Sequence, residues 1–295
     1  MLKGRLGLET ARIPQGDRHG LLWLGRGNLY VEDGTLRFMT AGYDEFQPGD
    51  YAVPFQMVSC ILLQPGTTVS HDALRLMARH GTGLLAVGEG AVRLYASMPF
   101  GPDESARARR QIELWADPPS RTQVVRRMYA WRMGDVVPAT DINALRGIEG
   151  ARVKASYRLL ASQFGIPWRG RRYDRSAPDD ADLPNRAINH AATACQAGAM
   201  VAVAVTGTIP QLGFIHEDSG IAFALDVADL FRESFVLPVA FGAARECLRG
   251  RASDEDLERS VRRLAGRTLR KEEVVGKMID RIKELLDGND RGGDA

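Results

Sequence analysis

The stretch AATACQAGAMVAVAV, from Ala191 to Val205, is the most apolar run in the chain. Small side chains dominate it, and it contains Gln196. A membrane-spanning helix needs about 20 consecutive apolar residues, and this run is shorter. It therefore predicts a buried core helix of a globular domain, over about 183–206, and no membrane partner.

The composition is that of a globular protein. The 295 residues allow one large or two ordinary domains, and 44% of them are hydrophobic and 26% charged. A net charge of +2 does not by itself indicate nucleic-acid binding, which would depend on local basic patches. Cys60, Cys195 and Cys247 fit neither a disulfide framework nor a metal spacing. No signal sequence opens the chain, so we expect a cytoplasmic protein.

The first part of the chain has strand patterns. LYVEDGTLRFM predicts a hairpin that turns at Asp33-Gly34, and VSCILL predicts a strand buried on both faces. A helix is expected between an N-cap at Ser70 and Gly81, followed by the strands GLLAV and AVRLYAS. Residues 1–97 are therefore predicted to form a small β-domain, a sheet with one crossover helix.

Nearly everything after a proline- and glycine-containing linker at 98–103 has helical spacing. The predicted helices are 103–116, 121–134, 141–164, 183–206, 226–246 and 253–287. The fold class is therefore α+β, with a small N-terminal β-domain and a larger all-α C-terminal domain over 104–288. Residues 289–295 read as a disordered tail.

Two acids and a histidine lie in an apolar setting in GFIHEDSGIAFALDVADLF, Gly213 to Phe231. Asp226 as an N-cap and Asp229 near the third helical position would suit the helix dipole, so capping alone explains them. His216 favours a functional site over capping alone, because the loop that enters this helix would bring its imidazole close to both acids. Two nearby carboxylates raise each other's pKa unless a cation lies between them, and a divalent ion would serve.

Glu149, in LRGIEGARV, is the candidate third acid. It lies in a predicted helix between Gly147 and Gly150, whose cost in a helix interior suggests that something large approaches the backbone. Helix–helix packing beside a solvated Glu149 is the alternative interpretation. The motifs GxSxG, GxxxxGK[ST] and HExxH are absent from the sequence.

Basic side chains cluster near these acids. Cations suit a phosphodiester backbone beside a metal at the reacting phosphorus, and Trp168 and Tyr173 can stack on an unpaired base. A solvated helix face is the alternative. The candidate DNA-binding residues are Arg93, Arg152, Arg158, Trp168, Arg171, Arg172 and Tyr173.

Several segments carry a family resemblance. LRGIEGARVKASYRLLASQFGIPWRGRRYD, NHAATACQAG and PQLGFIHEDSGIAFALDVADLF resemble, in this order, the CRISPR-associated spacer-acquisition integrase family, the larger, catalytic subunit of the adaptation complex. The segment LQPGTTVSHDALRLMARHGTGLLAVGEGAVRLYAS is similar to the β-domain of its Cascade-type (I-E) form. One departure is the loop after His216, where Glu217 and Asp218 replace the usual Thr-Gly and basic residue.

The resemblance implies a metal-dependent DNA integrase and endonuclease. Mg²⁺ or Mn²⁺ would be bound by Glu149, His216 and Asp229, with Asp226 as a supporting catalytic acid. A DNA 3′-hydroxyl would attack a phosphodiester and insert a spacer into a CRISPR array. The implied partners are double-stranded prespacer DNA with 3′ ends, CRISPR repeat DNA, a second copy in a homodimer formed through the β-domains, and a small ferredoxin-like subunit.

Two other functions remain open from the residues. The same acids could serve a stand-alone metal-dependent nuclease for branched DNA. A non-catalytic, dimeric DNA-binding protein, with acids that only cap helices, is the rival from another class.

Overall fold

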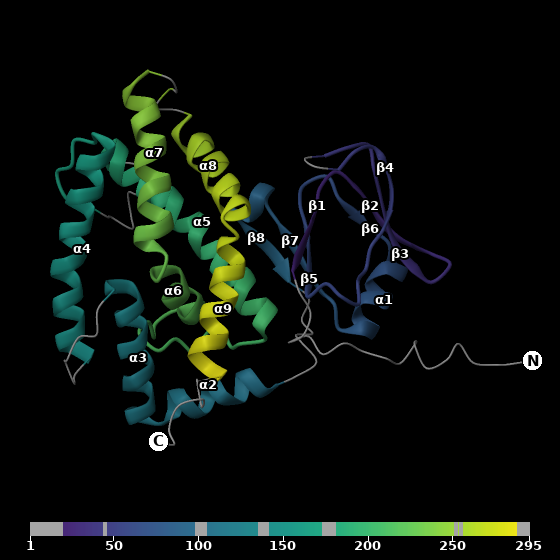
Figure 1. The fold of residues 1–295 in the computed structure, drawn as a ribbon, viewed down its shortest axis with the longest axis horizontal. Helices are drawn as coiled ribbons and strands as arrows, with labels where there is room; N and C mark the ends of the chain where they lie inside the picture. The colour runs from purple at the N-terminus through teal and green to yellow at the C-terminus, as the bar shows by residue number, and fades with distance from the viewer. Residues whose placement is uncertain are drawn as a thin grey trace, which may run out of the picture. The chain divides into compact units, whose positions relative to one another are not determined.

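A computed structural model describes residues 20–43, 46–97, 105–134, 142–172, 181–250, 253 and 256–287. The side chains of 133, 141–149 and 151 are not part of this description, and the predicted linker and tail lie outside it. The fold is mixed α+β (Figure 1). The chain divides into two compact units: the first runs to Gly88 and includes Tyr95–Ser105, and the second contains Glu89–Leu94 and the chain from Ala106.

The strands of the first unit form two four-stranded sheets, where the sequence predicted one. The extra sheet was missed because its added strands, including the two-residue β6, are too short for a clear alternation. One sheet has the order β1 (Leu21–Leu24), β5 (Cys60–Leu63), β7 (Gly83–Val87) and β8 (Leu94–Ser97). The other has the order β4 (Gly49–Ala52), β3 (Thr35–Thr40), β2 (Gly27–Glu32) and β6 (Thr68–Val69).

The local signals in this unit are confirmed. Asp33 and Gly34 both have positive φ, 49° and 75°, as a two-residue hairpin turn between β2 and β3 requires. Helix α1 (His71–His80) follows Ser70, whose Oγ accepts a hydrogen bond from the amide of Ala73 at 3.2 Å. Gly81 ends the helix in the left-handed conformation.

The second unit is helical. Its elements are η2 (Glu89–Ala91), α2 (Ala106–Ala116), α3 (Pro118–Met133), α4 (Ile142–Phe164), α5 (Leu183–Thr206), α6 (Ala222–Asp229), the π-helical turn η4 (Arg232–Val236), α7 (Leu237–Leu248), α8 (Leu257–Lys271) and α9 (Val274–Asp287).

Helix α5 is the centre of this unit and contacts α6, α7, α8 and α9 (Figure 1). By length and composition it could cross a membrane, but 61% of its apolar window is buried inside the protein. Small residues allow the close packing, because a Cβ added at Gly198 would lie 3.3 Å from the side chain of Leu269. The prediction of a buried core helix is confirmed.

Two predicted helices are interrupted. The segment predicted as one helix over 226–246 starts earlier, at Ala222, and comprises α6, η4 and α7. Pro238 lacks an amide hydrogen, which breaks the regular hydrogen-bond pattern where the π-turn passes into α7. The helix predicted over 253–287 divides into α8 and α9 around Glu273, whose φ is +50°.

Within the helical unit, η2 meets α8 backbone to backbone. Gly90 has a φ of +64°, and a Cβ added there would lie 2.6 Å from the Cα of Gly266. A side chain at position 90 would therefore add backbone strain to steric overlap.

We predict that Gly90→Ala lowers the free energy of unfolding by about 2–5 kcal/mol, measured by chemical denaturation. The control is Gly165→Ala, where φ is +67° and none of the described atoms lies within 4 Å of the added Cβ. In that variant the free energy of unfolding should fall only by the cost of the left-handed backbone conformation, about 1–2 kcal/mol. Equal losses for the two variants would show that η2 and α8 do not approach so closely.

Candidate functional site

Asp226 is fully buried at 0% exposure, in the second turn of α6. The predicted role as an N-cap is wrong: the N-cap is Ile221, which makes no side-chain capping bond. Instead the Asp226 carboxylate accepts hydrogen bonds from the amides of Phe214 (2.6 Å), Ile215 (3.0 Å) and His216 (3.0 Å). Asp226 thus orders the loop that leads to α6.

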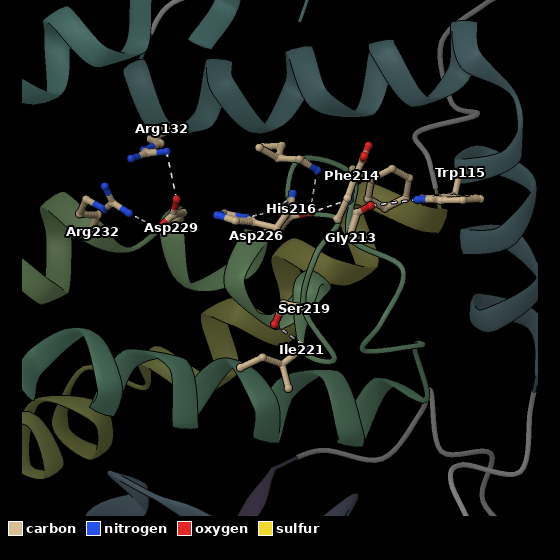
Figure 2. Close-up of polar contacts among 12 residues, drawn as sticks. Trp115, Arg132, Gly213, Phe214, His216, Ser219, Ile221, Asp226, Asp229 and Arg232 are labelled. Carbon is tan, nitrogen blue, oxygen red and sulfur yellow. Dashed lines mark hydrogen bonds and ion pairs between the residues drawn. The ribbon is translucent and has the colours of Figure 1, made fainter. Parts of the chain in front are cut away.

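The same carboxylate orients the imidazole of His216. Nδ1 of His216 lies 2.6 Å from Oδ1 of Asp226 (Figure 2). Because a carboxylate only accepts, this contact places a proton on Nδ1 and leaves Nε2 as the second functional nitrogen. The hydrogen bond to Asp226 raises the pKa of His216, with burial opposing it, and the charge of Asp229 adds to the rise.

Asp229, at the end of α6, is held by two arginines from different elements (Figure 2). Its Oδ2 lies 3.4 Å from Nη1 of Arg132 on α3, and its Oδ1 contacts Nη2 of Arg232 on η4. The side chains of Asp229 and Arg132 are only 23% and 6% exposed. Burial this deep requires a neutralising partner for the carboxylate, and the arginines supply it.

His216 and Asp229 line one cavity of about 180 Å³, together with Arg171 and Arg232. At about 30 Å³ per water molecule, this volume accommodates a small hydrated ion or a phosphate group. The wall includes Cys195, whose buried thiol donates to the carbonyl of Ala228 at 3.5 Å. Burial raises the pKa of Cys195, so the thiol stays protonated and is not a ready metal ligand.

Side chains of α2 hold the loop from its carbonyl side. Gln111 is fully buried; its Nε2 donates to the carbonyls of Ile209 (3.0 Å) and Leu212 (2.8 Å), and its Oε1 accepts from the amide of Ile209 (2.7 Å). Nε1 of Trp115 donates to the carbonyl of Gly213 at 2.9 Å. The irregular backbone before His216 therefore has its polar groups satisfied by side chains.

Seven predicted site residues lie between 149 and 173, and three of them, Glu149, Arg152 and Arg158, belong to α4. The backbone of Glu149 lies in α4, but its side chain is outside the described residues, as is all of Tyr173. Arg152 and Arg158 are exposed on α4. Among the side chains that the structure describes, no three of His, Cys, Asp or Glu form a metal-binding group. Glu149 as a third ligand stays a prediction.

Arg171 reaches the cavity with its guanidinium fixed by α5. Nη1 donates to Oδ1 of Asn185 at 3.0 Å, and Nη2 donates to Oδ1 of Asn189 at 2.7 Å. The backbone amide of Arg172 also donates to Oδ1 of the fully buried Asn185, at 2.9 Å. Asn185 therefore ties the predicted DNA-binding segment to the core helix.

Trp168 and Arg93 already have partners within the helical unit. The ring of Trp168 stacks on Tyr157, with centroids 5.2 Å apart, and meets Phe241 edge-on at 5.7 Å. Nη2 of Arg93 lies 2.9 Å from Oε1 of Glu258. Their proposed contacts with DNA stay predictions, and base stacking on Trp168 would have to use the ring surface that Tyr157 leaves.

Sequence reasoning missed Arg132, Arg232, Gln111 and Asn185. Arg232 lies three residues after Asp229, a spacing that pairs charges on a helical surface, so its role was readable. Arg132 and Gln111 act on groups about a hundred residues away in sequence, and no local pattern marks such contacts.

Comparisons with known proteins identify the family of this chain. A family model described as CRISPR associated protein Cas1 matches residues 129–261. The chain is 38% identical to a CRISPR-associated endonuclease Cas1 of Rhodospirillum rubrum, over 92% of this chain and 85% of that protein. It is 37% identical to Cas1 of Escherichia coli, over 93% and 87%.

Solved structures show the same fold. A TtCas1–DNA complex superposes with a TM-score of 0.81 and 32% identity, covering 92% of this chain and 98% of that one. A casposase bound to its integration product has a TM-score of 0.63 at 14% identity, a likeness of fold alone. Since the relatives exceed 30% identity over most of both chains, this chain belongs to the Cas1 family of CRISPR-associated endonucleases.

Proposed function

We propose that this chain is a metal-dependent DNA integrase that inserts foreign DNA fragments into a CRISPR array. A DNA 3′-hydroxyl attacks a phosphodiester of the repeat, exchanging one ester for another. The observation that carries the proposal is the cavity where His216 and Asp229 lie beside Arg171 and Arg232. Imidazole and carboxylate suit a divalent ion, and the arginines suit a phosphate.

The donor set fits Mg²⁺ or Mn²⁺. Metal-binding histidines commonly use one ring nitrogen for the metal and donate a hydrogen bond from the other ring N–H to a carboxylate. In His216, Nδ1 makes such a contact with Asp226. His216 and Asp229 would hold the ion, with Glu149 as the third ligand by resemblance. Such an ion, when bound, lowers the pKa of a hydroxyl and polarises the phosphate. A nitrogen ligand makes Mn²⁺ suitable alongside Mg²⁺.

The protein's own side chains orient the reactants. Arg171, fixed by Asn185 and Asn189, would neutralise a phosphate oxygen at the cavity. Asp226 holds the imidazole of His216 in one tautomer and orientation. Arg232 pairs with the carboxylate of Asp229. If Asp229 bound a divalent ion instead, the guanidinium of Arg232 would be available to pair with a phosphate.

The partners follow from the same proposal. The solved TtCas1–DNA complex supports DNA as the substrate. We assign the Cascade-type (I-E) form, a homodimer formed through the β-domains, a small ferredoxin-like partner subunit, and a cytoplasmic location. With water as the nucleophile the same site would be a nuclease for branched DNA; comparing strand joining with cutting, with and without the partner subunit, separates the two.

Asp229→Asn keeps the side-chain shape but removes the charge. We expect strand transfer to fall by about 1,000-fold or more, because several kcal/mol of metal-derived transition-state stabilisation are lost. DNA affinity measured without divalent ions should change little. The matched control is Asp218→Asn, which removes an exposed acid from the neighbouring loop. Full strand transfer by a folded Asp229→Asn protein would end the assignment of Asp229 as a ligand.

Divalent ions should stabilise the folded protein. At a hundred times its dissociation constant, Mn²⁺ should add about 2.7 kcal/mol to the free energy of unfolding, and a metal-titrated melting curve measures this. A non-catalytic DNA-binding protein would melt at the same temperature with or without the ion. His216→Ala should abolish the Mn²⁺ dependence of the melting temperature, while the metal-free variant still melts cooperatively.

Arg232→Gln should raise Mn²⁺ affinity in the absence of DNA by about fivefold, because a competing cation worth about 1 kcal/mol leaves Asp229. Isothermal titration measures the affinity. Arg249→Gln removes the same charge from an exposed position at the end of α7 and serves as the control. An equal gain in both variants would point to net charge rather than to competition at Asp229.

A further inference from the structure

Arg121, on α3, binds the backbone of the loop that carries His216. Its Nε and Nη2 both donate to the carbonyl oxygen of Phe214, at 3.1 and 2.9 Å. Phe214 is fully buried, so this carbonyl needs a donor from the protein. A guanidinium supplies two N–H groups in a fixed fork, which a lysine cannot do.

Arg121 is itself fixed from two further sides. Nη2 contacts the carboxylate of Glu217, and the guanidinium carbon lies 5.4 Å from the ring centroid of Trp115. Trp115 also donates to the carbonyl of Gly213. Figure 2 shows Trp115, Gly213, Phe214 and His216 in this arrangement. The side chain of Arg121 is 20% exposed and that of Glu217 is 57% exposed.

The loop is therefore held from opposite sides at a single residue. The amide of Phe214 donates to Asp226, while its carbonyl accepts from Arg121. His216 follows two residues later, and its own amide and ring also bind Asp226. Rotation of the peptide groups between these anchors would break hydrogen bonds at both of them.

We propose that Arg121 is a positioning residue for His216, and that Glu217 keeps the guanidinium of Arg121 in the orientation that donates to the carbonyl of Phe214. The acid at position 217 then has a role as a partner for Arg121, because its carboxylate contacts the guanidinium. The catalytic consequence rests on the proposed function; the effect on the loop does not.

The effect on the loop is measured by amide hydrogen exchange of the metal-free full chain. Arg121→Gln should speed exchange in the peptide spanning Phe214–His216 by about tenfold, with peptides of α5 and α9 unchanged. The control is Arg126→Gln, which removes an arginine from the same helix outside the loop contacts. Glu217→Gln, an exposed change that will fold, should produce a smaller increase in the same peptide.

The catalytic effect is measured as strand transfer by the full chain with its partner subunit and Mn²⁺. Arg121→Gln should lower kcat by about 10–100-fold, the range for residues that orient metal ligands, with DNA affinity within about twofold of the parent. Arg121→Lys should recover only part of the loss, because one ammonium group cannot reproduce the fork.

Unchanged exchange at Phe214–His216 in Arg121→Gln would overturn the proposal, and so would faster exchange spread equally over α5 and α9. Faster exchange confined to the loop supports it even if the parent protein proves inactive with every divalent ion. That last result would count against the proposed function alone.

Discussion

The site depends on the hydrogen bonds that the buried carboxylate of Asp226 accepts. An unpaired charge at 0% exposure would cost several kcal/mol, and here three amides and an imidazole satisfy it. These bonds fix α6 against a loop ten residues earlier in the sequence. Because Asp229 lies one turn further along α6, the same contacts that orient His216 also bring the second candidate ligand to the cavity.

A loop without regular structure carries the histidine, yet many of its peptide groups have side-chain hydrogen-bond partners. Its carbonyls accept from Gln111, Trp115 and Arg121, and its amides donate to Asp226. Functional loops are effective when a rigid scaffold positions them. Here the scaffold reaches the backbone through side chains, so precision at His216 depends on residues that never touch the cavity.

The features that could be predicted from the sequence are those that depend on neighbouring residues in the chain. The hairpin at Asp33-Gly34 and the core helix α5 were readable because turn residues and small apolar side chains act on their immediate neighbours. The start of α6 was misplaced because Asp226 has the residue type of a cap, while its actual partners come from the preceding loop. Likewise, Arg132 lies far along the chain from Asp229, and only tertiary packing brings them together.

The charges around Asp229 also constrain what the cavity can receive. Arg171 and Arg232 line it, and Arg132 contacts the same carboxylate, so among the described side chains near Asp229 the cations outnumber the acid. In the absence of a ligand the arginines neutralise Asp229. If a divalent ion takes that carboxylate, the positive charge in a half-buried space increases further, and only an anion can offset it. A phosphodiester meets that requirement, which is why metal and DNA would bind this site better together than either does separately.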